Sequence, residues 1–463
     1  MKLPTHRLRL DRSTLAVILT LAWPTMLEQL MQTAVQYIDT AMVGSLGTDA
    51  TAAVGATSTV GWLICHSISA LGVGFLSYIA KACGAGEREK AAHTASQGVL
   101  LVLTVGALFT ALPLALSRQV PVWMQVDPAI RTLAGTYFFI LYTPMLLRTA
   151  TIIFGTMLRA VGDTKTPMRV GILVNITNVV LNFLLIYPTR IISVFGLSVP
   201  VVGAGLGVVG AAVASAIAFA IGGICITASL WKHPVISPRS QSLRPNWTVL
   251  KPCLKVALPN MLQRFTTSLG YVAFAAMINS VGEVATAAHT IANTVESAFY
   301  IPGFGMQTAA ATLAGNAYGA KDNKKLKELS RMCLLIEVLL MLISGGLLFL
   351  LAPSMMRIFS RSEDVIRLGS TVLRMVAISE PFYGVSIILE GMNLGLGNTV
   401  TPFAYNTAGM WGIRIVGTFI CTQLLHMGLV SAWACMILHN LLLFALYTVQ
   451  YASGRWNPMR LRS

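Results

Sequence analysis

The sequence predicts an all-α integral membrane protein of twelve transmembrane helices, in two six-helix bundles related by a pseudo-two-fold axis along the membrane normal. The first observation is composition: 55% of residues are hydrophobic and only 11% are charged, whereas an average soluble domain has about 25% charged residues. The second observation is an internal repeat that covers most of the chain. The third is a series of apolar stretches that can each cross a bilayer, which takes about 20 residues.

The repeat has one fixed displacement. Residues 42–53 read MVGSLGTDATAA and residues 277–288 read MINSVGEVATAA, a copy displaced by 235 positions. The same displacement pairs prolines and glycines elsewhere: Pro24 with Pro259, Gly84 with Gly319, Gly162 with Gly397, and Pro167 with Pro402. Chance alignment of apolar runs does not produce such a series, so the chain contains two copies of one unit. Duplicated units in hydrophobic chains are typical of secondary transporters.

Twelve apolar stretches follow one another, six in each copy. Their approximate bounds are 14–43, 50–80, 92–117, 130–158, 167–187, 200–231, 250–280, 285–315, 328–352, 365–395, 401–424 and 428–453. Several contain proline or glycine and exceed the minimum length, which predicts tilted or bent helices. We expect an N-lobe at 14–231, a cytoplasmic linker at 232–249 and a C-lobe at 250–453. An even number of spans returns each copy to its starting side, so both lobes share one topology.

The basic residues predict the orientation. With the N-terminus inside, the cytoplasmic segments contain 23 of the 33 Lys and Arg residues, and the outer loops contain 6. The positive-inside rule then places both termini in the cytoplasm and the protein in the plasma membrane, which is the inner membrane of a Gram-negative cell. Basic loops that face anionic headgroups explain the net charge of +16, so nucleic-acid binding is not indicated. The apolar N-terminal stretch is too long for a signal peptide and predicts a retained first span.

Several other classes of site are not indicated. The seven cysteines are dispersed and mostly lie within predicted spans, so we expect neither a disulfide framework nor a metal site. The turns GAGEREK (84–90) and GAKDNKK (319–325) are not Walker A sequences, which argues against ATP as the energy source. The sequence contains no HExxH, paired aspartate or GxSxG motif, so we do not expect an enzyme.

Ionisable residues inside the bilayer mark candidate sites, because a charge at the bilayer centre costs about 2.5–3.5 kcal/mol on insertion scales. The predicted spans contain Glu28, Asp39, Arg148, Arg264, Glu296, Glu337, Arg374, Glu380, Glu390 and Arg414. Asp39 has the most informative context. Its counterpart in the second copy is Phe274, so the duplicated fold does not require a carboxylate at this position.

The fifth span carries three asparagines on one helical face, namely Asn175, Asn178 and Asn182. Their counterparts in the second copy are not polar: Met410, Ile413 and Gly417. A carboxylate with amide oxygens suits Na⁺, and the carboxylate alone suits a proton. The alternative is an interhelical hydrogen-bond network that binds no ion.

Five further ionisable residues are candidates for a substrate site or a C-lobe network: Glu28, Glu296, Glu380, Glu390 and Arg414. Glu28 precedes Asp39 by 11 residues, which places the two about 20° apart around a straight helix. Glu28 therefore either shares a cavity face with Asp39 or makes a buried hydrogen bond.

The chain resembles the multidrug and toxic compound extrusion (MATE) family. The resemblance rests on DTAMVGSLG (39–47) after Pro24, RAVGDTKTP (159–167) after the fourth span, the GxxGAAxA pattern at 207–214, and the repeated layout. It covers about residues 14 to 453. It implies two bundles of six helices around a central cleft, and antiport of amphipathic, often cationic, compounds against Na⁺ or H⁺.

The resemblance also assigns roles to residues. Asp39 matches the first-span aspartate that is central to coupling in the branch with an N-lobe cation site. Asn178 and Asn182 match the fifth-span pair of that branch, where the second member can be an aspartate. Ser215 falls where a sixth-span threonine contributes an oxygen, and Pro24 matches a first-span proline associated with helix bending. Because Asn182 removes a charge, either Na⁺ or H⁺ remains open as the coupling ion.

Another branch of the family has its cation site in the C-lobe, with a carboxylate in span 7 and an aspartate in span 10. Here span 7 has no carboxylate before Glu283 at its outer end, and neither Glu380 nor Glu390 aligns securely with that aspartate. This mismatch favours coupling in the N-lobe. Glu296, Glu380 and Arg414 then form either a structural salt bridge or a substrate site.

The sequence therefore predicts a drug antiporter without a cofactor, which acts as a monomer on amphipathic small molecules among membrane lipids. The alternative is a lipid-linked saccharide flippase of the same superfamily. Arginines that line a central cavity would favour the flippase, and Arg148, Arg264 and Arg414 are the candidates.

Overall fold

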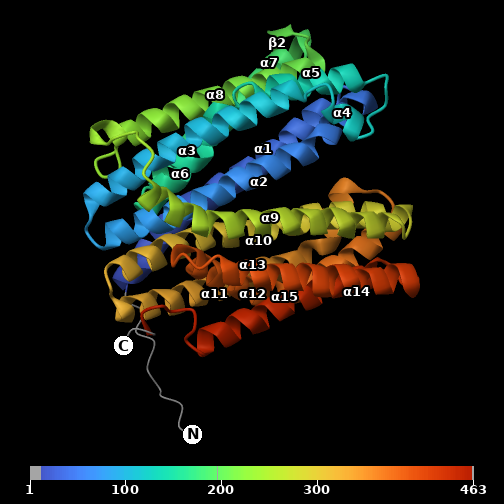
Figure 1. The fold of residues 1–463 in the computed structure, drawn as a ribbon. Helices are drawn as coiled ribbons and strands as arrows, with labels where there is room; N and C mark the ends of the chain where they lie inside the picture. Colours follow the sequence, from blue (N-terminus) through green and yellow to red (C-terminus); the bar gives the residue numbers. More distant parts are fainter. Residues whose placement is uncertain (1–11, 195–196, 461–463) are drawn as a thin grey trace. The chain divides into compact units, whose positions relative to one another are not determined.

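The computed structural model describes residues 12–194 and 197–460, and this described part is 84% helical (Figure 1). The first copy contains α1 Arg12–Gly44, α2 Thr48–Gly84, α3 Arg88–Ala115, the short α4 Val120–Trp123, α5 Arg131–Tyr142, α6 Met145–Ala160, α7 Lys165–Leu185 and α8 Gly207–Lys232. The connection to the second copy includes the 3₁₀ turn η1, Pro238–Ser240. The second copy contains α9 Trp247–Asn279, α10 Glu283–Gly319, α11 Asn323–Phe359, α12 Glu363–Gly395, α13 Val400–Thr407, η2 Ala408–Ile415, α14 Val416–Phe419, η3 Ile420–Leu424 and α15 Leu429–Ala452.

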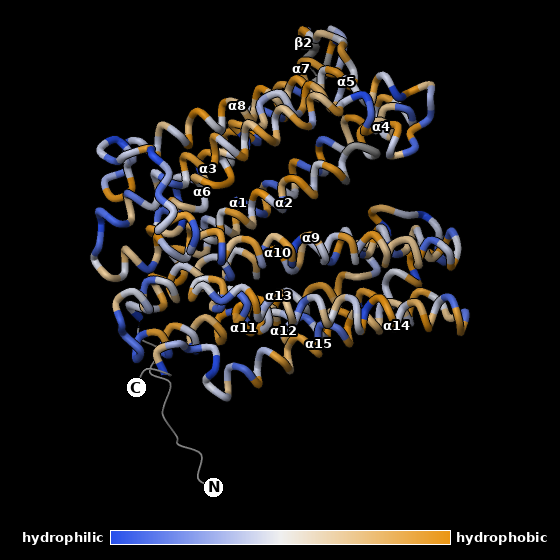
Figure 2. Tube along the Cα trace, viewed as in Figure 1, coloured by the Kyte–Doolittle hydropathy of each residue, from blue (hydrophilic) through white to orange (hydrophobic). Residues whose placement is uncertain are grey.

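Every predicted span corresponds to helical structure, with two spans built from consecutive helical pieces. Among the described residues, eight helices are long and apolar enough to cross a membrane, or nine if the bent pair α5–α6 counts as one span. Figure 2 shows hydrophobic residues along the helices, with hydrophilic residues gathered at helix ends and in the connections. The prediction of an all-α membrane fold is confirmed.

The helix boundaries repeat the sequence displacement. Helices α9, α10, α11 and α13 begin 235 positions after α1, α2, α3 and α7, respectively. The turns between helices follow the same rule: Gly47 and Gly282 both have positive φ, of 118° and 144°, and so do Gly162 and Gly397, of 87° and 79°. Glycine adopts this left-handed backbone without the steric cost that a Cβ would add. The two copies therefore share local backbone geometry as well as sequence.

The sixth span begins later than predicted. Residues 200–206 are not helical, because β2 (Leu197–Ala204) pairs antiparallel with β1 (Pro188–Val194). Helix α8 begins only at Gly207, after Gly205, and both glycines have positive φ. The valine-rich segment is apolar enough to imitate a span, but β-branched residues also favour strands. In Figure 1 this hairpin lies beyond the ends of α7 and α8.

Two spans are irregular, and one of them is bent, as the content of proline and glycine predicted. The fourth bends by 49° between α5 and α6, where Pro144 has no N–H to continue the hydrogen-bond ladder. The eleventh contains two π-helical segments, η2 and η3, and π-helical insertions often occur at functional positions.

The chain divides into two compact units, which are described separately. The N-terminal unit is Leu27–Leu269, and the C-terminal unit is Gly270 onward together with the described residues up to Met26. Two helices therefore change unit along their length: α1 after Met26 and α9 after Leu269. In the C-terminal unit, Ile18 and Leu21 of α1 pack in the same buried cluster as Met306 of α10.

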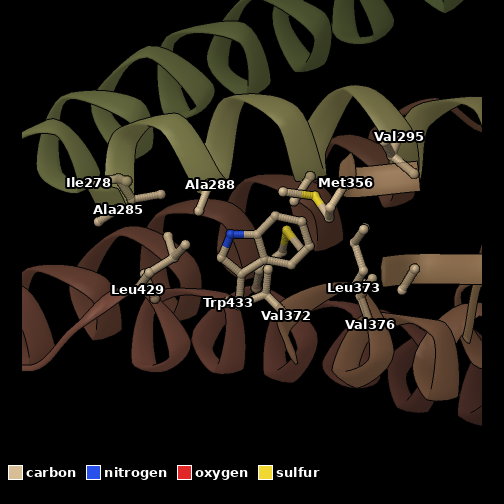
Figure 3. Packing of buried hydrophobic residues seen from close by; sticks show 14 of the residues in the cluster. Ile278, Ala285, Ala288, Val295, Met356, Val372, Leu373, Val376, Leu429 and Trp433 are labelled. Carbon is tan, nitrogen blue, oxygen red and sulfur yellow. The ribbon is translucent and has the colours of Figure 1, made fainter. Parts of the chain in front are cut away.

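The larger core of the C-terminal unit surrounds Trp433 (Figure 3). This side chain is fully buried, and its Nε1 donates a hydrogen bond to Nδ1 of His289 at 3.2 Å. Apolar residues from α9, α10, α11, α12 and α15 meet there. Elsewhere in the same unit, the Sγ atoms of Cys421 and Cys435 lie 4.0 Å apart, a proximity that their sequence spacing did not reveal.

Candidate functional site

In the N-terminal unit, four predicted residues meet where α1, α7 and α8 face one another. Asn182 donates a hydrogen bond from Nδ2 to Oδ1 of Asp39. The same nitrogen donates to Oδ1 of Asn178 at 3.2 Å, and the amide of Asn178 lies 2.9 Å from Oγ of Ser215. The two asparagines and Ser215 are buried, whereas Asp39 is half-buried. The structure thus joins Asp39, Asn178, Asn182 and Ser215 into one hydrogen-bonded chain.

Close packing of α8 against its neighbours brings Ser215 to this chain. A Cβ atom on Gly210 would lie 2.5 Å from the carbonyl oxygen of Leu185, and one on Gly223 would lie 2.5 Å from that of Leu147. Only a residue without a side chain allows these backbones to approach so closely. The buried residues Ala211, Ala212 and Ala214 also have small side chains, so the helix surface beside Ser215 can pack closely. Asn175 is also buried. Among the described residues, no hydrogen bond joins its side chain to the hydrogen-bonded group around Asp39.

The amide of Asn178 fits in two orientations. In one, its nitrogen donates to Oγ of Ser215 and its oxygen accepts from Asn182. In the other, its nitrogen donates to both carboxylate oxygens of Asp39, at 2.8 and 3.1 Å, and its oxygen accepts from Ser215 at 2.9 Å. An amide orientation follows from the hydrogen bonds that its neighbours require. An ionised Asp39 requires donors and favours the second orientation, whereas a protonated Asp39 can donate to the amide oxygen of the first.

Glu28 belongs to a different contact on α1. Nη2 of Arg159, on α6, donates to both carboxylate oxygens of Glu28 at 2.7 and 2.6 Å. The two side chains are 16% and 15% exposed, so this ion pair is shielded from water. Glu28 thus makes a hydrogen-bonded contact, part-buried rather than fully buried, as one of its two interpretations predicted. Arg159 was not singled out from the sequence, although it begins the RAVGDTKTP motif. Pro24 lies one turn before Glu28, inside α1, and is buried.

The C-terminal unit has a different arrangement at the repeat-related position. Phe274, the counterpart of Asp39, lies under the guanidinium group of Arg414, whose Cζ is 4.3 Å from the ring centroid. Nη2 of Arg414 also lies 3.0 Å from Sδ of Met436. The ion pairs found in the described residues do not include Arg414. Aromatic and sulfur contacts thus surround this arginine where a salt bridge with Glu296 or Glu380 was one expectation.

The remaining candidate carboxylates lie on α10 and α12. Glu296 and Glu380 are buried, and Oε2 of Glu380 has no hydrogen-bond partner among the described residues. Glu390 is half-buried, and its Oε2 lies 3.4 Å from Nδ2 of Asn406. Glu337 on α11 is fully buried; sequence analysis placed it among the intramembrane charges without a specific role.

Comparison with known proteins agrees with this architecture. The MatE family model matches residues 24–184 and 259–420, one segment in each copy. A probable multidrug resistance protein NorM from Thermotoga maritima is 27% identical over 439 residues, which cover 95% of this chain and 92% of the relative. A probable multidrug resistance protein YpnP from Bacillus subtilis is 24% identical and covers 97% of each chain. The fold is similar to that of a crystal structure of MATE in complex with MaL6, with a TM-score of 0.86, 23% identity and 96% coverage of both chains.

Proposed function

The chain belongs to the MatE family of membrane transporters, and from this premise we propose that it is a secondary active antiporter. It exports amphipathic, cationic drugs or toxic compounds in exchange for H⁺ or Na⁺. The names of its relatives, each a probable multidrug resistance protein, support multidrug efflux. The observation that carries the coupling proposal is the hydrogen-bonded chain around Asp39 in the N-terminal unit.

The asymmetry between the copies supports a functional role for this chain. If Asp39 and its amides were needed only to pack α1 against α7, the second copy would need similar polar residues. Instead it has Phe274 and Ile413 at the positions of Asp39 and Asn178. The corresponding spans of the second copy therefore pack without this carboxylate and amide, although the eleventh span is π-helical over Ala408–Ile415. A half-buried carboxylate is retained in one copy because it binds an ion.

Proton binding at Asp39 changes the hydrogen bonds that its neighbours can make. The ionised carboxylate accepts from Asn182 and from the rotated amide of Asn178, while Ser215 donates to the amide oxygen. After protonation the carboxyl group donates to the Asn178 oxygen, and the Asn178 nitrogen donates to Ser215. The charge of Asp39 on α1 thereby determines the orientation of the Asn178 amide on α7, and with it the hydrogen bond between Asn178 and Ser215 on α8.

Sodium is the alternative coupling ion, because the same residues supply oxygen ligands. Oδ1 of Asn182 is buried and has no hydrogen-bond partner among the described residues. With the Asp39 carboxylate and the Ser215 hydroxyl it gives the hard oxygen donors that cations such as Na⁺ prefer. A single carboxylate leaves the site neutral when one Na⁺ or one proton is bound.

Helix α1 transmits the change. Pro24 removes one backbone hydrogen bond from the helix interior, which creates a point where the helix can bend. Two residues later the helix passes from one unit to the other. Ion and substrate need only favour different states for exchange to follow, because a ligand shifts an equilibrium by its differential affinity.

The remaining parts of the proposal concern the cellular setting. The transporter lies in the plasma membrane with both termini and the 232–249 linker in the cytoplasm, as the distribution of basic residues supports. It works as a monomer among lipids and needs no cofactor besides the coupling ion.

Transport by purified protein in liposomes tests the proposal. A fluorescent cationic dye would be loaded against a Na⁺ gradient or a pH gradient, each imposed alone. We expect one of the two gradients to drive accumulation, and Asp39→Asn to abolish it while the protein remains folded. Equal transport with neither gradient imposed would contradict coupled antiport.

A further inference from the structure

A second buried carboxyl group, in the C-terminal unit, is placed to bind a proton. Glu337 lies in the middle of α11 and has no exposed surface. Neither Oε1 nor Oε2 has a hydrogen-bond partner among the described residues. An ionised carboxylate is strongly disfavoured in such surroundings unless it is paired and hydrogen-bonded. The neutral acid is the form that this packing accommodates.

Glycines and apolar side chains of the neighbouring helices pack closely against the carboxyl group of Glu337. A Cβ atom on Gly303 of α10 would lie 2.6 Å from Oε1, and one on Gly384 of α12 would lie 3.2 Å from it. Side chains of Met341 and Ile387 complete this contact with Gly303. A metal ion needs several oxygen or nitrogen ligands, and no group of three His, Cys, Asp or Glu residues in the described chain could hold one.

Other titratable groups face the same region from each neighbouring helix. On α12, Glu380 lies one turn before Gly384 and is within electrostatic range of both Glu337 and Glu296. On α10, Glu296 and Tyr300 precede Gly303 by seven and three residues, and Glu296 also senses Arg414. On α11 itself, the thiol of Cys333 lies one turn before Glu337. Adjacent carboxyl groups disfavour simultaneous ionisation, so the charge of Glu380 affects whether Glu337 can lose its proton.

The repeat shows that packing does not require this acid. The counterpart of Glu337 in the first copy is Val102, which is also buried. The counterparts of Glu296 and Glu380 are Gly61 and Met145. The three carboxyl groups therefore belong to the second copy alone, just as the Asp39 chain belongs to the first.

Each of the two helices that enclose Glu337 contains a proline within one turn of the glycine that lies against its carboxyl group. Pro302 precedes Gly303 in α10, and Pro381 follows Glu380 in α12. Each proline removes a backbone hydrogen bond and permits a bend. We propose that Glu337 is a second proton-binding site, which carries a proton in this packing and loses it when α10 and α12 bend at Pro302 and Pro381.

Infrared spectroscopy of the purified full-length protein tests this site without any transport measurement. The pH would be stepped from acid to alkaline, and the C=O stretching band of protonated carboxyl groups compared between Asp39→Asn and Asp39→Asn/Glu337→Gln. We expect the second variant to lack one titrating band that the first retains. Glu363→Gln, a change at an exposed carboxylate on α12, is the matched control and should retain that band. Identical spectra for the first two variants would overturn the proposal.

Proton release on binding of the cationic dye ethidium gives a second measurement, which rests on the proposed function. In weakly buffered detergent solution, Asp39→Asn should still release protons when ethidium binds. Addition of Glu337→Gln, or of Glu337→Val if the first change prevents folding, should reduce this release at least twofold. Unchanged release would overturn the proposal. A protein that does not bind ethidium would contradict drug transport, while the infrared comparison would still decide the site.

Discussion

Replacement of Asn182 by alanine tests the coupling site most sharply, because its effect differs between the two ions. The change removes the hydrogen bond to Asp39 and the 3.2 Å bond to Asn178. A hydrogen bond to a charged group contributes about 1.5–3 kcal/mol, and the neutral bond to Asn178 within α7 contributes less. Because Asp39 is half-buried, we take the lower end, about 1.5 kcal/mol, which corresponds to a roughly tenfold change in ion binding.

The effect of Asn182→Ala on ion binding depends on which ion is coupled. The amide N–H of Asn182 stabilises the ionised carboxylate, so its loss makes Asp39 hold a proton more tightly. For proton coupling, the pH at half-maximal transport should therefore rise by about one unit. For sodium coupling, the change removes the Asn182 oxygen as a ligand, and the Na⁺ concentration at half-maximal transport should rise about tenfold.

The assay is dye transport in proteoliposomes at a series of pH values and Na⁺ concentrations, normalised for reconstituted protein. Ile413→Val, at the counterpart of Asn178, is a conservative control in the second copy and should leave both midpoints unchanged. If neither midpoint moves in Asn182→Ala, or if the control moves them equally, the asparagines serve only packing. The cation site must then be sought among the carboxylates of the C-terminal unit.

Three further predictions concern structure and topology. Glu28→Gln should lower the free energy of unfolding by about 1–3 kcal/mol, because the Arg159 pair is largely buried, whereas Glu87→Gln in an exposed pair should cost below about 0.5 kcal/mol; equal thermal shifts would refute the distinction. Gly210→Ala should destabilise the protein by about 1–3 kcal/mol, since its Cβ meets backbone at 2.5 Å, while Gly346→Ala, which meets nothing within 4 Å, should not. An impermeant thiol reagent should not label Gln241→Cys in intact cells of a cysteine-free variant, and labelling there would reverse the predicted orientation.

The sequence predicted the helices well because two independent physical signals agree. Apolar length marks each span, and the fixed displacement of 235 positions repeats the glycines that end the helices. The hairpin at 188–204 escaped because hydropathy does not distinguish an apolar strand from a short span. The valines at 199, 201 and 202 extend the apolar stretch that precedes α8, and only the pairing of the backbone reveals the strand.

The candidate site was predicted in part. Asp39, Asn178, Asn182 and Ser215 do lie together, as helical periodicity and the resemblance together suggested. Hydrogen-bond partners from distant segments could not be predicted, because periodicity shows which residues share a face of one helix but not which helix packs against that face. Arg159 is therefore known as the partner of Glu28 only from the structure.

The same limit explains why Glu337 received no role from the sequence. The side chain of a lone glutamate in an apolar span can reach the membrane–water interface, form an ion pair with a basic residue, or be buried among other helices. The glycines at 303 and 384 that enclose it come from two other helices. Its significance depends on three-dimensional packing together with the comparison to Val102.

The most direct test of the central claim is ion-driven efflux by wild-type protein and Asp39→Asn in proteoliposomes, under separate Na⁺ and pH gradients. Coupling at Asp39 predicts that one gradient drives dye transport in the wild type, and that the well-folded variant loses this response while it still binds the dye. Gradient-driven transport by Asp39→Asn at the wild-type rate would contradict the account.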